Sequence, residues 1–286
     1  MGERTAIAWT EKTWNPWQGC HKVSAGCTLC YMYSEKIRYG QRPNVVVRSK
    51  PPTFNAPMKW KEPARVFTCS WSDWFIEEAD AWRDEAWEII RHAPHLTYQI
   101  LTKRPERIAD HLPAGWPLGN VWLGVSVENQ AAADERIPHL LATPAALRFL
   151  SVEPLLAPVT LGLRAGPGID WVIAGGESGP GARPCNVAWI RSLMAQCRAA
   201  HVPAFLKQLG AHVITRNDDG LSGCDADDWQ LDDPEGQVEE DLDGTRDGYQ
   251  GAPVRVHLRD RKGGDPAEWP ADLRVREYPK SNRKET

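Results

Sequence analysis

The sequence lacks the features of a membrane or exported protein. No apolar run approaches the roughly 20 residues that a membrane-spanning helix needs. The first residues, MGERTAIAWTEK, have no basic start followed by an apolar stretch. We therefore expect a cytoplasmic protein. Its 42% hydrophobic and 25% charged residues are typical of an ordinary globular chain.

Cysteine is too unevenly placed for a disulfide framework. The chain has seven cysteines, an odd number, and Cys20, Cys27 and Cys30 crowd within eleven residues. This crowding suits metal ligation in a reducing compartment better than a set of disulfides. The widely spaced later cysteines form no motif, and Cys197 is expected in the core of a helix.

Positive charge is concentrated in the first part of the chain. Residues 1–210 carry a net charge of +4 and residues 211–286 a net charge of −8. Residues 36–65 hold eight basic residues and one acid, with aromatic residues interleaved. Such a segment can follow a phosphate backbone and stack on bases, although a solvated basic loop has the same composition. The residues predicted to contact nucleic acid are Arg38, Arg42, Arg48, Lys50, Lys59 and, further along, Arg104.

From residue 65 onward, short apolar runs alternate with helical patterns, which indicates βα units around a parallel sheet. The expected strands cover 65–69, 97–101, 121–127, 147–152, 171–174 and 204–207, with another ending near residue 19. The expected helices cover 79–92, 105–111, 131–141 and 187–200. Six or seven such units predict an α/β fold, a full or partial parallel β/α (TIM-like) barrel. A doubly wound open sheet shares this local pattern.

Polar side chains follow each expected strand, and in β/α barrels these strand ends build the active site. For one residue alone a helix cap or a turn explains the polarity, but six consecutive strand ends favour one shared site. The groups in question are Ser70, Ser72 and Asp73; Lys103 and Arg104; Ser126, Glu128 and Asn129; Glu153; Gly175, Gly176 and Glu177; and Lys207 and Gln208.

The chain changes character after residue 210. We expect residues 1–210 to form the barrel with its cysteine loop, and residues 211–286 to form an extension. The stretch 217–251 is rich in Asp, Glu and Gly, which is typical of a linker or an acidic loop. The runs 254–258 and 273–276 flank a glycine-containing turn and are expected to pair as a small hairpin.

The three N-terminal cysteines are spaced by six and then two residues. Three thiolates can bind three irons of a 4Fe-4S cluster and leave the fourth iron to S-adenosylmethionine. Reductive cleavage of this ligand gives a 5'-deoxyadenosyl radical, which abstracts hydrogen from unreactive C–H bonds. Protein side chains alone have no group of comparable reactivity. Tyr31, directly after the last cysteine, is placed to pack against adenine.

A zinc site is the alternative, because Cys-x2-Cys is half of many zinc ligand sets. His21 or Cys69 could supply a fourth ligand. No second ligand pair follows at a similar spacing, and joint ligation by the adjacent Cys20 and His21 would be strained. Cys69, at an expected strand end, is the more serious competitor.

Several motifs resemble the phage gene-product-37/68 family, in the same order and over about residues 5–210. They are the stretch 14–31, Leu-Thr-Lys-Arg-Pro at 101–105, Trp-Leu-Gly-Val-Ser-Val-Glu-Asn at 122–129, Glu-Pro-Leu at 153–155 and Gly-Gly-Glu-Ser-Gly-Pro-Gly-Ala-Arg-Pro at 175–184. The family is similar to radical S-adenosylmethionine barrels. Some radical enzymes of phages tailor thymine bases that already carry an amino-acid substituent.

The sequence departs from most radical enzymes in two respects. Their cysteines are spaced by three and then two residues, so the loop path around a cluster must differ here. Their Gly-Gly-Glu stretch, which binds the amino group of the cofactor, follows an early strand, whereas Gly175, Gly176 and Glu177 follow a late one. These residues could instead seat a phosphate or carboxylate with Arg183, or form a tight turn.

The site residues follow from this interpretation. Lys103 and Glu153 are predicted to be catalytic, with Lys103 binding an anion. The predicted metal ligands are Cys20, Cys27 and Cys30, and the predicted cofactor-binding residues are Tyr31, Ser126, Glu128, Asn129, Gly175, Gly176, Glu177 and Arg183. A ring of salt bridges lining the barrel is the ordinary alternative for the charged members.

We therefore expect a radical S-adenosylmethionine enzyme that acts on a nucleic-acid base, an amino-acid-modified thymidine in phage DNA. An external electron donor such as flavodoxin or ferredoxin would reduce the cluster. A zinc-stabilised nucleic-acid-binding protein without catalysis is the alternative from another class. A lyase that repairs pyrimidine photoproducts would share the cofactor and differ in its substrate.

Overall fold

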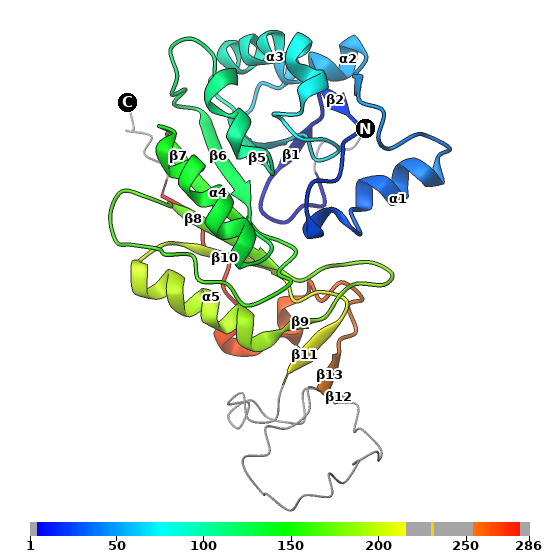
Figure 1. The fold of residues 1–286 in the computed structure, drawn as a ribbon, viewed down its shortest axis with the longest axis vertical. Coiled ribbons are helices and arrows are strands. Elements are labelled where there is room, and N and C mark those ends of the chain that lie inside the picture. The colour runs from blue at the N-terminus through cyan, green and yellow to red at the C-terminus, as the bar shows by residue number, and fades with distance from the viewer. Residues whose placement is uncertain (1–4, 216–229, 232–253, 281–286) are drawn as a thin grey trace, which may run out of the picture.

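A parallel sheet organises the molecule (Figure 1), for which a computed structural model describes residues 5–215, 230–231 and 254–280. The seven strands are parallel to their neighbours and occur in the order β1-β4-β5-β6-β7-β8-β10. They are β1 (Lys12–Trp14), β4 (Arg65–Thr68), β5 (Thr97–Thr102), β6 (Val121–Ser126), β7 (Leu147–Val152), β8 (Trp171–Gly175) and β10 (Ala204–Gln208). The sheet curls but does not close. It is a half-barrel because β1 and β10 are its edge strands and do not pair with each other. This confirms the predicted α/β class as a partial parallel β/α barrel.

The strand expected near residue 19 does not belong to this sheet. A short strand, β2 (Trp17–Gln18), ends there, but it pairs antiparallel with β3 (Val47–Arg48). Gly19 then turns the chain at φ +99, where a Cβ would lie 2.2 Å from the carbonyl oxygen of Val45. The first barrel strand is the earlier β1, and residues 15–64 form a long excursion before β4.

Three longer helices cover one face of the sheet: α3 (Asp80–His92), α4 (Gln130–Ala142) and α5 (Val187–Ala200). The expected helix 105–111 instead forms two 3-10 turns, η4 (Pro105–Arg107) and η5 (Ala109–His111). So short a segment gains little from helix propagation. The excursion adds η1 (Ala25–Cys27), α1 (Tyr31–Arg38), α2 (Pro51–Phe54) and η2 (Ala56–Lys59), and η3 (Glu77–Ala79) precedes α3. Within the described ranges, no helix is long and apolar enough to cross a bilayer.

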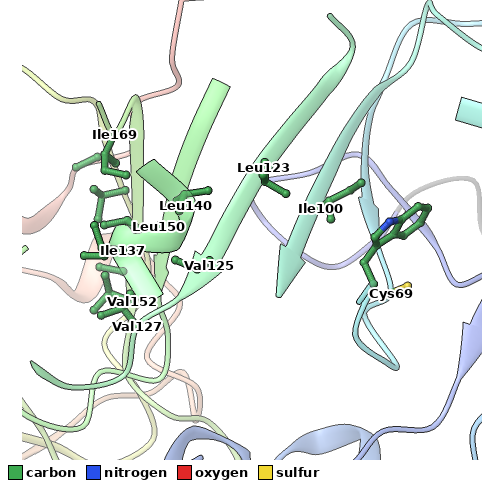
Figure 2. Close-up of a cluster of buried hydrophobic side chains, with 14 of the residues drawn as sticks. Cys69, Ile100, Leu123, Val125, Val127, Ile137, Leu140, Leu150, Val152 and Ile169 are labelled. Atoms are coloured by element: carbon green, nitrogen blue, oxygen red, sulfur yellow. The ribbon is translucent and has the colours of Figure 1, made fainter. Parts of the chain in front are cut away.

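The main core lies between the helices and the sheet. In Figure 2, Ile137 and Leu140 of α4 lie against the strand residues Val125, Leu150 and Val152, and all five are buried. Each such side chain contributes roughly 1.5–3 kcal/mol when it leaves water. This packing holds the strands in register and therefore fixes where their C-terminal ends meet.

A second core of aromatic residues fills the opposite face of the sheet. The Trp171 ring lies at its centre, with the Trp9 and Trp122 rings at centroid distances of 6.3 and 5.8 Å. The rings of Phe149 and Phe205 are 6.0 and 6.2 Å from it. These aromatic rings fill much of the inside of the half-barrel, and Trp9 and Phe67 of this core also line the cavity at the C-terminal ends of the strands.

The C-terminal part differs from the expected arrangement. β13 (Val254–His257) pairs with β11 (Val213–Thr215) and β12 (Gln230–Leu231), and β9 (Cys185–Asn186) completes this small sheet. The run 273–276 does not pair with β13 but runs beside β10, where Arg276 bridges to Phe205. The turns η7 (Pro266–Glu268) and η8 (Ala271–Leu273) separate the two runs. Most of the acidic stretch 217–251 lies outside the described residues.

Candidate functional site

One cavity of about 260 Å³ lies at the C-terminal ends of the barrel strands, and all three N-terminal cysteines line it. Lys103, Arg104, Ser126, Glu153, Gly176, Glu177 and Tyr31 contribute to the same walls. Ser126 ends β6, Tyr31 begins α1, and the other five residues directly follow β5, β7 and β8. The cysteines lie in the cysteine loop, here defined as residues 20–30. The half-barrel thus brings together most of the side chains that the strand-end pattern selected.

The path of the cysteine loop is fixed by hydrogen bonds from α1 and within the loop itself. Tyr33 donates its hydroxyl to the Cys20 carbonyl at 2.5 Å, and Lys22 donates to the Thr28 carbonyl at 2.7 Å. Cys27 ends η1, and Cys30 directly precedes α1. All three cysteines are partly exposed and free of disulfides.

The thiols of Cys20 and Cys27 differ in pKa. Burial raises the pKa of Cys20 to about 12, and the Asp73 carboxylate adds to this rise while Arg104 opposes it. Burial also disfavours the thiolate of Cys27. There the charge of Lys103 and hydrogen bonds from Val23 and Ser24 outweigh burial, so the pKa of Cys27 is lowered. The thiolate, which is the metal-binding form, is therefore favoured at Cys27.

Asp73, buried after β4, organises the strand-end residues beside the cysteines. Its carboxylate accepts from the Thr102 hydroxyl at 2.7 Å and from the Lys103 backbone N–H at 2.9 Å. It also pairs with Arg104 at 3.2 Å. The same guanidinium lies 3.8 Å from Cys20 Sγ. The strand-end pattern includes Asp73 but does not show that it holds the neighbouring strand-end residues.

The charged ends of Lys103 and Glu153 lie on the cavity wall. Lys103 Nζ donates to the Ser126 hydroxyl at 3.1 Å. Glu153 forms an ion pair with Lys207, another cavity residue that the sequence placed at a strand end without a role. The cavity therefore presents the ammonium groups of Lys103 and Lys207 and the carboxylate of Glu153 beside the cysteines. The two other carboxylates of its lining, Asp73 and Glu177, are paired with arginines. Such a mixture of charges suits a zwitterionic ligand.

Four of the residues predicted to bind a cofactor make contacts within the protein instead. Asn129 caps α4 by accepting from the Ala132 N–H, and Glu128 forms an ion pair with buried Arg136 at 2.9 Å. Glu177 is held by Arg183, whose Nη2 lies 2.6 Å from its Oε1. Asn129, Glu128 and Arg183 are not part of the cavity lining, and their predicted role as cofactor ligands stays a prediction.

The two glycines at the end of β8 serve close packing. A Cβ at Gly176 would lie 2.0 Å from the Leu209 carbonyl oxygen, and one at Gly175 would lie 3.3 Å from that of Gln208. The Gly176 N–H donates to the Gln208 carbonyl at 3.1 Å. Glycine is thus required at position 176 for the approach of β10.

Tyr31 lines the cavity, and its hydroxyl donates to the Ser70 carbonyl at 2.5 Å. Among the residues predicted to contact nucleic acid, Arg38, Arg42, Lys50 and Lys59 are exposed. Arg48 pairs with Glu85 and lies over the Phe54 ring at 3.8 Å. Arg104 is buried beside Cys20, so it faces the cavity and not the outer surface.

The three cysteines are the candidate ligands of a metal centre in this cavity. Within the described residues, no three His, Cys, Asp or Glu side chains are grouped to hold one metal ion. His21 pairs with Glu78 at 2.5 Å, and Cys69 is buried with its thiol pKa raised well above normal, chiefly by burial. A four-iron cluster has its irons at separate corners, so its thiolates need not meet at one point. Three cysteines around one cavity meet that requirement.

Fold and cavity together define a partial β/α barrel whose open end is lined by three cysteines. The family described as "Protein of unknown function (DUF5131)" matches residues 4–262, and the chain belongs to it. No curated protein matches the chain significantly. Among solved structures, a mutant of spore photoproduct lyase is similar at 12% identity and a TM-score of 0.42, covering 91% of this chain and 72% of that one.

Proposed function

We propose that this protein is a radical S-adenosylmethionine enzyme that acts on a nucleic-acid base. The observation that carries the proposal is the gathering of Cys20, Cys27 and Cys30 on one cavity at the C-terminal ends of a parallel sheet. Active sites of β/α barrels lie at this end. Three cysteines would hold three irons and leave one iron open to the cofactor.

The residues of the cavity would bind and orient the cofactor and the substrate. A bound cluster would supply the electron that cleaves S-adenosylmethionine. Lys103 offers a positive charge for a carboxylate, and the Glu153–Lys207 pair offers a carboxylate for an amino group or for ribose hydroxyls. The aromatic core beneath closes the cavity floor, so the reacting groups would be screened from water on that side.

The proposed substrate is a thymidine that carries an amino-acid substituent, within DNA. Helix α1 begins at the cavity residue Tyr31 and ends at exposed Arg38, and exposed Arg42 follows in the next turn. Tyr39 beside them is 64% exposed. Such side chains can bind phosphates and stack on bases. An external flavodoxin or ferredoxin would deliver the electron.

Anaerobic purification tests the proposal. We expect a brown protein with about four irons per chain, which forms 5'-deoxyadenosine from S-adenosylmethionine after reduction. Cys27→Ala should abolish iron binding. Cys197→Ala, which changes a buried cysteine of α5, should retain it. A colourless protein with one zinc would instead establish the non-catalytic alternative.

The substrate needs a separate experiment. The reconstituted protein would be incubated with DNA that contains amino-acid-modified thymidine and, in parallel, with ultraviolet-irradiated DNA. Conversion of the first supports tailoring of a modified base, whereas conversion of the second alone would assign a repair lyase. Mass spectrometry of the digested nucleosides distinguishes the two.

A further inference from the structure

The peptide unit between Ala25 and Gly26 is held at both ends by charged side chains. Arg183 Nη1 donates to the Ala25 carbonyl at 2.9 Å, and the Gly26 N–H donates to Glu128 Oε1 at 3.2 Å. This peptide lies in η1, directly before Cys27. Two distant parts of the chain thus fix one peptide inside the cysteine loop.

Both holding side chains are themselves anchored. Glu128 is 1% exposed at the end of β6, and it accepts from Arg136 at 2.9 Å. Arg183 is fixed by Glu177, which accepts from its Nε at 2.9 Å and from its Nη2 at 2.6 Å. Charge-assisted bonds of this kind are about twice as strong as neutral ones. The loop is therefore fastened to the ends of β6 and β8 through rigid pairs.

The close approach depends on a small residue at position 26. A Cβ added to Gly26 would lie 3.1 Å from the carboxyl carbon of Glu128 and 3.2 Å from its Oε1. Such contacts are tighter than ordinary van der Waals distances, and Glu128 has little freedom to withdraw because Arg136 holds it. The absence of a side chain at Gly26 therefore allows the Glu128 carboxylate to reach this peptide.

We propose that Glu128 and Arg183, the loop-holding pair, are positioning residues that preset the path of the cysteine loop before any metal binds. A spacing of six residues between Cys20 and Cys27 leaves a longer segment to order than a spacing of three. Ordering it has an entropic cost. Fixing the peptide before Cys27 removes much of that cost from cluster assembly. The inference rests on the proposed function only for the identity of the bound group.

Hydrogen exchange of the metal-free full-length chain tests the pair directly. The amides of Gly26, Cys27 and Thr28 are hydrogen-bonded in the structure. In Arg183→Ala we expect them to exchange at least about tenfold faster, because a charge-assisted bond is lost. Gly26→Ala should have a similar effect. Glu128→Gln is less decisive, since it leaves buried Arg136 without its charge partner.

The control is Arg191→Ala, which removes an ion pair between α5 and Asp272 and should leave exchange in the loop unchanged. In the two test variants, the amount of iron taken up during reconstitution should also fall. Arg183→Lys should restore little of the iron uptake or of the slow exchange, because lysine cannot pair with a carboxylate through two parallel bonds.

The outcomes separate the two proposals. Unchanged exchange and normal iron content, with weaker S-adenosylmethionine binding, would overturn the positioning role and make Arg183 a cofactor ligand. Faster loop exchange in a protein whose wild type takes up no iron would support the loop-holding pair and refute the proposed enzyme.

Discussion

Cys20 and Cys27 share one cavity but differ in how readily they lose a proton. Lys103 and local hydrogen bonds overcome burial at Cys27 and lower its pKa, whereas burial raises that of Cys20. Metal binding requires thiolates and releases protons. The thiolate is therefore favoured at Cys27 and disfavoured at Cys20 in the protein without metal.

Lys103 is the residue whose removal should reveal an anionic ligand. Lys103→Ala should weaken S-adenosylmethionine binding by about tenfold, the effect of one lost charge-assisted bond, without changing the melting temperature. Exposed Lys59→Ala is the control. Equilibrium binding and thermal melting provide the two measurements, and a lower melting temperature with unchanged affinity would disprove the assignment.

Gly176 makes a prediction about stability. A Cβ there would overlap the Leu209 carbonyl, so Gly176→Ala should lower the free energy of unfolding by about 1–3 kcal/mol or more. Gly168→Ala is the control, since a Cβ at that position would meet no atom within 4 Å. Denaturant titration compares the two, and equal midpoints would contradict the packing role.

At the scale of elements, the connection between β8 and β9 depends on the Glu177–Arg183 pair. Burial alone would raise the pKa of Glu177, but hydrogen bonds and charge from Arg183 lower it. A carboxyl whose folded pKa is depressed stabilises the protein above its unfolded pKa of about 4.3. That stabilisation is lost as the pH falls through the folded value.

The Glu177→Gln variant should show this dependence. The difference in unfolding free energy between wild type and variant should be full at neutral pH and shrink as the pH falls below about 4. Denaturant titrations across the pH range provide the measurement. A constant difference would mean that the charge of Glu177 does not contribute.

Local patterns predicted most elements because their cause is local. The apolar runs of β5 to β8 are buried on both faces, and the periodicity at 187–200 matches α5. β1 was not predicted, because its three residues, Lys-Thr-Trp, are too few to show a strand pattern of apolar residues. The contact of Arg183 with Ala25 joins residues 158 positions apart, so only the folded chain could reveal that Arg183 holds the cysteine loop.

At the scale of the whole molecule, exposed positive charge is concentrated in residues 36–65. The composition of the sequence predicted this basic region, but the structure shows that some of its basic residues are not available to bind a polyanion. Lys36 is buried, and Arg48 pairs with Glu85. The surface that remains for a polyanion is formed by Arg38, Arg42, Lys50 and Lys59.

The double variant Arg38→Ala/Arg42→Ala tests this surface. Binding to single-stranded oligonucleotides should weaken, and the slope of log affinity against log salt should fall by about 1.4, about 0.7 for each lost phosphate contact on a single strand. Arg261→Ala/Lys262→Ala changes two exposed cations of the C-terminal part and should have no such effect. Fluorescence anisotropy at several salt concentrations gives the comparison, and equal slopes would exclude the surface.

The half-barrel leaves β10 as the last strand of its sheet, and the C-terminal segment covers that edge. Leu206 donates to the Val275 carbonyl, Glu277 donates to that of Ala204, and the Tyr278 hydroxyl reaches the Ala8 carbonyl. Unpaired sheet edges are templates for aggregation. By covering the edge of β10, residues 275–278 should prevent another chain from pairing with it. A chain that ends before residue 275 is expected to precipitate even with an intact cysteine loop.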